Sequence, residues 1–173
     1  MSWHRYDGIT LNTMDDSNVM VCDPIFDIGD IGTLDIRLPR GYYSCFYNIT
    51  NDEFIGQKIA ASMILRRDLE SIWASSCLLG KGFSVKNISE KIRCVSGIAG
   101  FVIGDRASMD WADNWRVFEK GLAKSGNVIT HRKDDDFFDQ AYFTSAGMGE
   151  GEYRVQVVEY KGTPVGIVLI FIG

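Results

Sequence analysis

Residues 152–172 read EYRVQVVEYKGTPVGIVLIFI, and this stretch decides the fold class. Apolar and polar residues alternate over 152–160, which is the pattern of a half-buried strand. Residues 161–164 contain the Gly and Pro of a turn, and residues 165–172 are rich in Val and Ile. Two strand patterns joined by a short turn predict a C-terminal antiparallel β-hairpin.

Further strands are predicted upstream of the hairpin. Residues 57–66 are apolar on one face and partly apolar on the other, which favours a central strand over a helix. Residues 33–38 alternate, with the apolar side chains on one face and Asp35 and Arg37 on the other. Residues 69–79 fit either a helix or a strand. The other predicted strands are residues 18–22, 42–49, 91–95, 98–103 and 142–145.

One main amphipathic helix is predicted over about residues 105–124. Apolar side chains recur there at steps of four and three, which places on one face Ala107, Trp111, Trp115, Phe118 and Leu122. Asp105 suits the N-cap, and Gly126 suits the C-terminal end. These elements predict a single α+β domain over residues 1–173, strand-rich, with mostly antiparallel sheet or sheets.

Composition limits the classes of function. The chain is 46% hydrophobic, enough for a core without metal or disulfide staples. Its net charge of -5 argues against a nucleic-acid-binding surface, which needs clustered Lys and Arg, and suits a basic protein partner. The first residues are polar, and the longest apolar run is far too short to cross a bilayer. We therefore expect a cytoplasmic protein with no membrane insertion.

The cysteines and histidines do not form a metal-binding pattern. The 4 cysteines are widely spaced, none forms a CxxC pair, and there are only 2 histidines. Cys22 and Cys45 lie in strand-like segments, where a thiol behaves as a small apolar group. We expect reduced core thiols, no metal, no cofactor and no assignable catalytic residue, although the fold could still bring a thiol or hydroxyl to His4 or His131.

Two polar segments are candidates for binding. Residues 147–151 are rich in glycine, but a strand follows them instead of the helix that a phosphate loop requires, so a tight turn is expected. Residues 131–139 are predicted to form a polar loop. That loop contains Asp134, Asp135, Asp136 and Asp139, which form either a solvated surface or an acidic contact for a Lys- or Arg-rich partner.

Aromatic residues supply candidate anchors for a partner. Tyr42, Tyr43, Phe46 and Tyr47 fall in one predicted strand, where alternation turns one of two adjacent tyrosines outward. Exposed tyrosines are favoured anchors in protein interfaces. We expect Tyr43 and Tyr47 to contact the partner together with the acidic loop.

Several short motifs together resemble the bacterial DUF4241 family, whose function is not known. The pieces that are similar, with Glu150 in place of an Asp, are residues 21–24, 38–43, 59–65, 97–101 and 147–155. The resemblance implies a strand-rich α+β fold and a bacterial origin, and it brings no catalytic residues. Small acidic domains of this kind resemble the immunity proteins of bacterial toxin systems.

These observations lead to three expectations about function. The first is a non-enzymatic protein-binding domain, most concretely an immunity protein that neutralises a cognate toxin by occluding its active or substrate-binding surface. The alternative is a small enzyme or ligand-binding domain whose site is assembled from distant residues near the glycine-rich turn at 147–151. A third possibility is a structural component of a larger assembly.

Overall fold

The structure is a computed structural model dominated by β-strands. It describes residues 3–13, 18–23, 33–54, 56–74, 81–94, 100–105, 128–132, 139–146 and 149–172. The strands are β1 Trp3–Thr13, β2 Asn18–Cys22, β3 Leu34–Arg37, β4 Gly41–Asp52, β5 Gly56–Arg66, β6 Phe83–Cys94, β7 Gly100–Asp105, β8 Val128–Arg132, β9 Asp139–Ser145, β10 Gly151–Tyr160 and β11 Thr163–Ile170. A 3₁₀ turn, η1 Arg67–Leu69, leads into the short helix α1 Glu70–Ala74.

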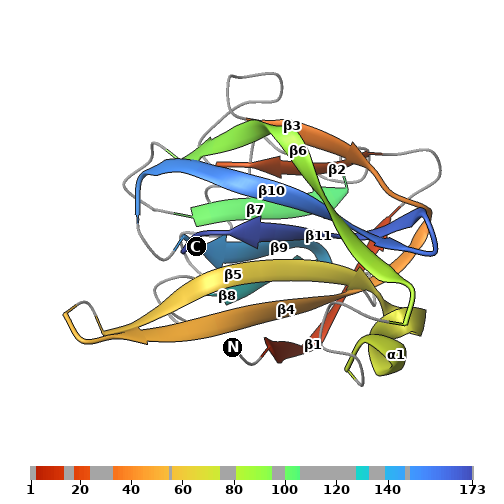
Figure 1. The fold of residues 1–173 in the computed structure, drawn as a ribbon, viewed down its shortest axis with the longest axis horizontal. Helices are drawn as coiled ribbons and strands as arrows, with labels where there is room; N and C mark the ends of the chain where they lie inside the picture. Colours follow the sequence, from red (N-terminus) through yellow and green to blue (C-terminus); the bar gives the residue numbers. More distant parts are fainter. Residues whose placement is uncertain are drawn as a thin grey trace.

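All of these strands belong to one sheet, in the order β3-β2-β7-β9-β1-β4-β5-β11-β10-β6. The remaining strand, β8, pairs with β9 and stands outside this order. Neighbours are antiparallel except β1 and β9, which are parallel. The sheet is strongly twisted (Figure 1). Register shifts interrupt several of the ladders, and such bulges bend strands and let a sheet curve.

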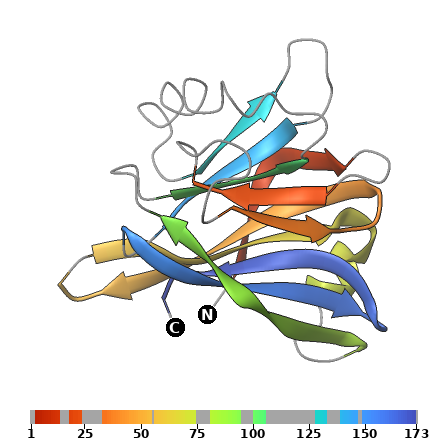
Figure 2. The same ribbon diagram turned by 90° about the horizontal axis from the view of Figure 1, so that it is seen from above.

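The curvature brings the two halves of the sheet face to face, as the view from above shows (Figure 2). Ser62 on β5 and Thr144 on β9 share a short hydrogen bond, although β1 and β4 separate their strands in the sheet order. Apolar side chains from both halves fill the space between them, among them Val21, Ile64 and Leu169. This main core buries one face of β5, including Ile59 and Ile64.

A second apolar cluster lies on the opposite face of β4 and β5. Trp73 of α1 packs there with its ring centroid 5.1 Å from that of Phe46. Polar contacts hold the helix in place, because Glu70 accepts a hydrogen bond from Ser44 at 3.0 Å and pairs with Arg5. The short helix therefore covers the sheet near the start of β4.

The α+β, strand-rich fold is confirmed. The hairpin of β10 and β11 forms with Tyr160 opposite Thr163, and β2 spans the predicted residues. In β3 the alternation holds, since Ile36 is buried while Asp35 and Arg37 are exposed. Residues 57–66 form the central strand that their apolar pattern favours.

Other elements differ from the sequence prediction. Residues 3–13 form β1, although no strand is predicted there, and β6 begins at Phe83 instead of residue 91. The predicted polar loop over 131–139 is wrong at both ends, because His131 lies in β8 and Asp139 begins β9. In each case backbone pairing with a neighbouring strand overrides a weak local pattern. Asp105 ends β7, and the rest of the helix predicted over 105–124 lies outside the described residues.

Two tyrosines fix the starts of β4 and β10 in the same way. The Tyr43 hydroxyl donates a hydrogen bond of 2.5 Å to the carbonyl oxygen of Pro39, and Tyr153 donates one of 2.5 Å to that of Gly149. Both bonds reach back four residues. In both motifs the middle residue is a glycine with φ +153°, namely Gly41 and Gly151.

Candidate functional site

The acidic residues proposed as partner contacts lie mostly beyond the part of the chain that the structure describes. Asp134, Asp135 and Asp136 fall outside the described residues. Asp139 is placed through its backbone, which pairs with Leu11 of β1 and Arg132 of β8, while its side chain is also outside the described set. The acidic contact therefore stays a prediction.

The structure describes both tyrosines that are predicted to contact a partner, and the burial of Tyr43 contradicts that prediction. Tyr43 is fully buried in the main core, so it cannot anchor a partner, and the expectation for this residue is wrong. Its neighbour Tyr42 is the exposed member of the pair, with 45% of its surface accessible. Tyr47 is partly buried and stacks on His4, with ring centroids 5.4 Å apart. Adjacent side chains of a strand point to opposite faces, so the burial of Tyr43 in the core turns Tyr42 outward.

The buried thiols and hydroxyls that the structure describes serve the core. Cys22 and Cys45 are buried, as expected, while Cys77 and the Cys94 side chain lie outside the described residues. Burial, aided by the nearby carboxylates of Asp23 and Asp35, raises the pKa of the Cys22 thiol, which keeps it protonated. A protonated, enclosed thiol is a poor nucleophile.

A cluster of buried hydroxyl groups crosses the interior. Tyr142 donates a hydrogen bond of 3.3 Å to the carbonyl oxygen of Phe46, close to the bond between Ser62 and Thr144. Burial raises the pKa of Tyr142, so this hydroxyl stays neutral. Within the described ranges, no three His, Cys, Asp or Glu side chains gather where they could hold a metal ion. The cluster satisfies buried polar groups across the two halves of the sheet.

In the glycine-rich segment before β10, Gly149 makes two hydrogen bonds through its backbone. The Gly149 amide donates a hydrogen bond of 3.0 Å to the carbonyl of Ala146, and the Gly149 carbonyl accepts the Tyr153 hydroxyl. Gly147 and Met148 lie outside the described residues. The described part of this segment is thus a turn that the Tyr153 hydroxyl holds closed.

An arginine-lined hollow of about 500 Å³ opens where β4 begins and β5 ends. Its lining residues are Arg40, Gly41, Tyr42, Arg66, Arg67 and Asp68. The hollow depends on the sheet, because Tyr43 pairs with Arg66 across β4 and β5 and thereby brings the two segments together. Three guanidinium groups and one carboxylate leave this small region positive, in a chain whose net charge is -5.

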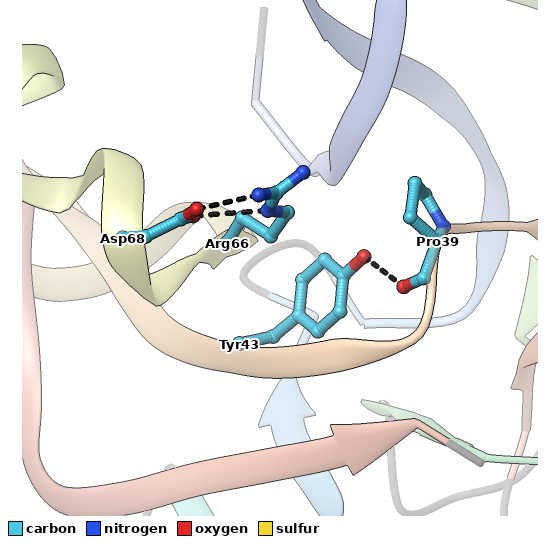
Figure 3. A network of polar contacts seen from close by, with 4 residues as sticks. All are labelled: Pro39, Tyr43, Arg66 and Asp68. Carbon is cyan, nitrogen blue, oxygen red and sulfur yellow. Dashed lines mark hydrogen bonds and ion pairs between the residues drawn. The ribbon is translucent and has the colours of Figure 1, made fainter.

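Figure 3 shows how the hollow is held in shape. Arg66 donates two hydrogen bonds to the Asp68 carboxylate, from Nε at 2.9 Å and from Nη2 at 2.5 Å. This contact with Asp68 raises the pKa of Arg66. On the other side, the Tyr43 hydroxyl holds Pro39 next to Arg40. Burial raises the pKa of Tyr43, so its hydroxyl remains a donor.

An exposed aromatic side chain, Phe54, lies at the tip of the hairpin formed by β4 and β5. Phe54 lies in the turn between these strands and is 95% exposed. The hairpin projects from the body of the molecule (Figure 1). β1 pairs with β4 only as far as Asn48, and β11 pairs with β5 only as far as Ala61, so among the described residues the outer part is a two-stranded ribbon.

Neither the arginine-lined hollow nor the exposed Phe54 is predicted from the sequence. Arg40 and the Arg66-Arg67 pair are distant in sequence, and only the register of two strands joins them. A signal for Phe54 was present, since an aromatic residue within the turn-like run of residues 51–56 has no alternating pattern that would bury it.

No family model, curated protein or solved structure matches this chain. None of the helices in the described part of the chain has the length and apolar character needed to cross a membrane.

Proposed function

We propose that this protein is a non-enzymatic protein-binding domain, and most concretely an immunity protein that neutralises a cognate toxin by occluding its active or substrate-binding surface. The observation that carries the proposal is Phe54, which is 95% exposed at the end of a projecting hairpin. The family resemblance to DUF4241 proteins and the acidic character of small immunity proteins supply the specific form of the proposal.

An aromatic side chain at this position suits binding to an apolar pocket. Burying a Phe side chain contributes about 1.5–3 kcal/mol, and little of that is realised inside this chain while Phe54 is almost fully exposed. Interface hot spots are typically aromatic side chains seated in a partner's pocket. Glu53 beside it is acidic, and the whole chain carries -5. The expected occupant is therefore a protein with an apolar pocket in a basic surface.

The test uses the product of the gene adjacent to the gene for this chain, which the proposal expects to be a toxin. The full chain is expected to bind that product in a pull-down and to protect cells on co-expression. Phe54→Ala is expected to weaken binding at least tenfold, because hot-spot truncations cost about 2 kcal/mol or more. Val85→Ala, at an exposed apolar position on β6, is the matched control and should bind like the wild type. Absence of both binding and protection by the wild type would end the proposal.

A second candidate function is small-ligand binding, which the arginine-lined hollow favours. Its position differs from the one expected near residues 147–151, because the hollow lies at the start of β4 and the end of β5.

A further inference from the structure

We infer that the arginine-lined hollow binds a small phosphorylated compound that carries a planar ring, of the nucleoside monophosphate class. The site is distinct from the hairpin tip. Tyr43 and Asp52 mark the two ends of the part of β4 that pairs with β5, about 30 Å apart at the usual rise of a strand. The inference deepens the second candidate function and stands on different residues from those of the hairpin proposal.

The charge of the hollow selects an anion. Arg40, Arg66 and Arg67 line it with a single carboxylate, that of Asp68, so the lining carries a net charge of +2. Charges beyond about 8 Å are largely screened at physiological salt, and the local charge therefore counts for more than the chain's total of -5. A guanidinium group can donate two parallel N–H hydrogen bonds to the oxygens of one phosphate, which fixes the orientation of the phosphate.

Arg66 and Arg67 retain hydrogen-bonding capacity for a ligand. A guanidinium has five N–H donors, and the Asp68 carboxylate uses two of those on Arg66. The contact also holds the Arg66 group in one orientation, which reduces the entropy that binding would cost. Arg67 has no ion-pair partner among the residues that the structure describes, and its side chain is exposed.

Tyr42 supplies a surface for the planar ring. It lines the same hollow with 45% of its surface accessible, and aromatic faces stack well on nucleobases. The loop bearing Arg40 is fixed relative to Tyr42, because Pro39 is held by the Tyr43 hydroxyl. An anion-binding group and an aromatic face are thus placed side by side where one strand begins.

Size and charge favour a small molecule over a nucleic acid. A volume of about 500 Å³ lies within the range of small-ligand sites. A nucleic acid would require an extended basic surface, whereas the lining of this hollow supplies three arginines and one opposing carboxylate.

Titration of the full chain with AMP and, separately, with inorganic phosphate tests the inference by calorimetry and by NMR shifts. AMP is expected to bind with a stoichiometry of one, and more tightly than phosphate. Arg67→Gln and Arg40→Gln should each weaken AMP binding about tenfold, since each removes a charge-assisted contact. Arg93→Gln removes an exposed arginine on β6, outside the hollow, and is the matched control.

Two further variants separate the parts of the site. Tyr42→Ala should weaken AMP binding while leaving phosphate binding unchanged, because only AMP carries a ring. Phe54→Ala should leave AMP binding unchanged, so that failure of the hairpin proposal and failure of this one can be told apart. No saturable AMP binding by the wild type, or an equal loss in Arg93→Gln and Arg67→Gln, would overturn the inference. If the wild type bound phosphate as tightly as AMP, the part of the inference that assigns a planar ring to the ligand would be wrong.

Discussion

The hydroxyl of Tyr43 donates a hydrogen bond of 2.5 Å to the carbonyl oxygen of Pro39, four residues earlier, and so ties the loop before β4 to the strand itself. Tyr153 makes the same contact with Gly149 before β10. Each tyrosine fills a core position with its ring and satisfies a turn carbonyl with its hydroxyl. This geometry accounts for the residue types found where the two strands begin.

Removing either hydroxyl is expected to destabilise the fold. Tyr43→Phe and Tyr153→Phe leave the ring in the core but deprive the carbonyl of its donor, which costs about 1–2 kcal/mol of unfolding free energy. Urea unfolding measures the change. Tyr160→Phe is the control, because the Tyr160 ring packs on Phe83 and its hydroxyl makes no hydrogen bond within the described ranges. A loss at Tyr160 as large as at Tyr43 would contradict the role given to these hydrogen bonds.

The glycine in the same motif is expected to be required for its backbone angle. Gly41 has φ +153°, a conformation that other residues rarely adopt, and an added Cβ would meet no atom within 4 Å. Gly41→Ala should therefore cost about 1–3 kcal/mol through backbone strain alone. The change is measured by thermal unfolding, with the exposed strand position Ser84→Ala as control. Equal melting temperatures for Gly41→Ala and the wild type would show that the backbone at the start of β4 relaxes.

Two phenylalanines are expected to respond in opposite ways to truncation. Phe54→Ala should change the unfolding free energy by less than about 0.5 kcal/mol, since the side chain is 95% exposed. Phe101→Ala should cost about 3–5 kcal/mol, because that ring is fully buried against Tyr153 and Phe171. Chemical denaturation measures both. A large loss for Phe54→Ala would mean that the tip packs against the body of the protein.

Alkaline pH is expected to destabilise the protein. Burial raises the pKa of Cys22 above its ordinary value of 9.0, and those of Tyr43 and Tyr142 above 10.0. Above these ordinary values the unfolded chain releases protons that the folded chain retains, so the unfolded state is favoured as pH rises. Each such group lowers the unfolding free energy by about 1.4 kcal/mol per pH unit.

Melting temperatures recorded from about pH 7 to 11 test this expectation. They should be level below about pH 9 and fall above it, since the thiol and phenol groups of the unfolded chain begin to ionise there. Tyr142→Phe removes one of the groups and should make the fall above about pH 10 less steep, judged against its own melting temperature at neutral pH. An unchanged slope in this variant would show that Tyr142 ionises alike in both states.

The prediction of individual strands succeeded where burial was two-sided or alternating. In β5, residues 59–65 are buried on both faces, one against the main core and the other against the cluster that includes Trp73 of α1, and their apolar composition is visible in the sequence. It failed for the start of β6, where Ser84, Lys86 and Asn87 are all exposed on a strand at the edge of the sheet. An exposed edge strand needs few apolar residues, so composition does not reveal it.

In the candidate sites too, local pattern predicts only part of the arrangement and strand register decides the rest. Alternation predicted that one of Tyr42 and Tyr43 faces outward, but the register that begins at Gly41 selects Tyr42. Arg40 and Arg66 line the same hollow only because β4 and β5 pair with Tyr43 opposite Arg66. The proximity of residues this far apart in the chain depends on strand register, which local pattern does not encode.

Local chemistry along the chain was sufficient to predict the strand-rich class, the C-terminal hairpin, the central strand and the buried thiols of Cys22 and Cys45, because periodicity and turn residues act over a few positions. The curling of the sheet, the arginine-lined hollow and the projection of Phe54 arise from pairings between distant strands. Long-range register and curvature are collective properties of the folded sheet, and they place the surfaces on which the proposed functions depend.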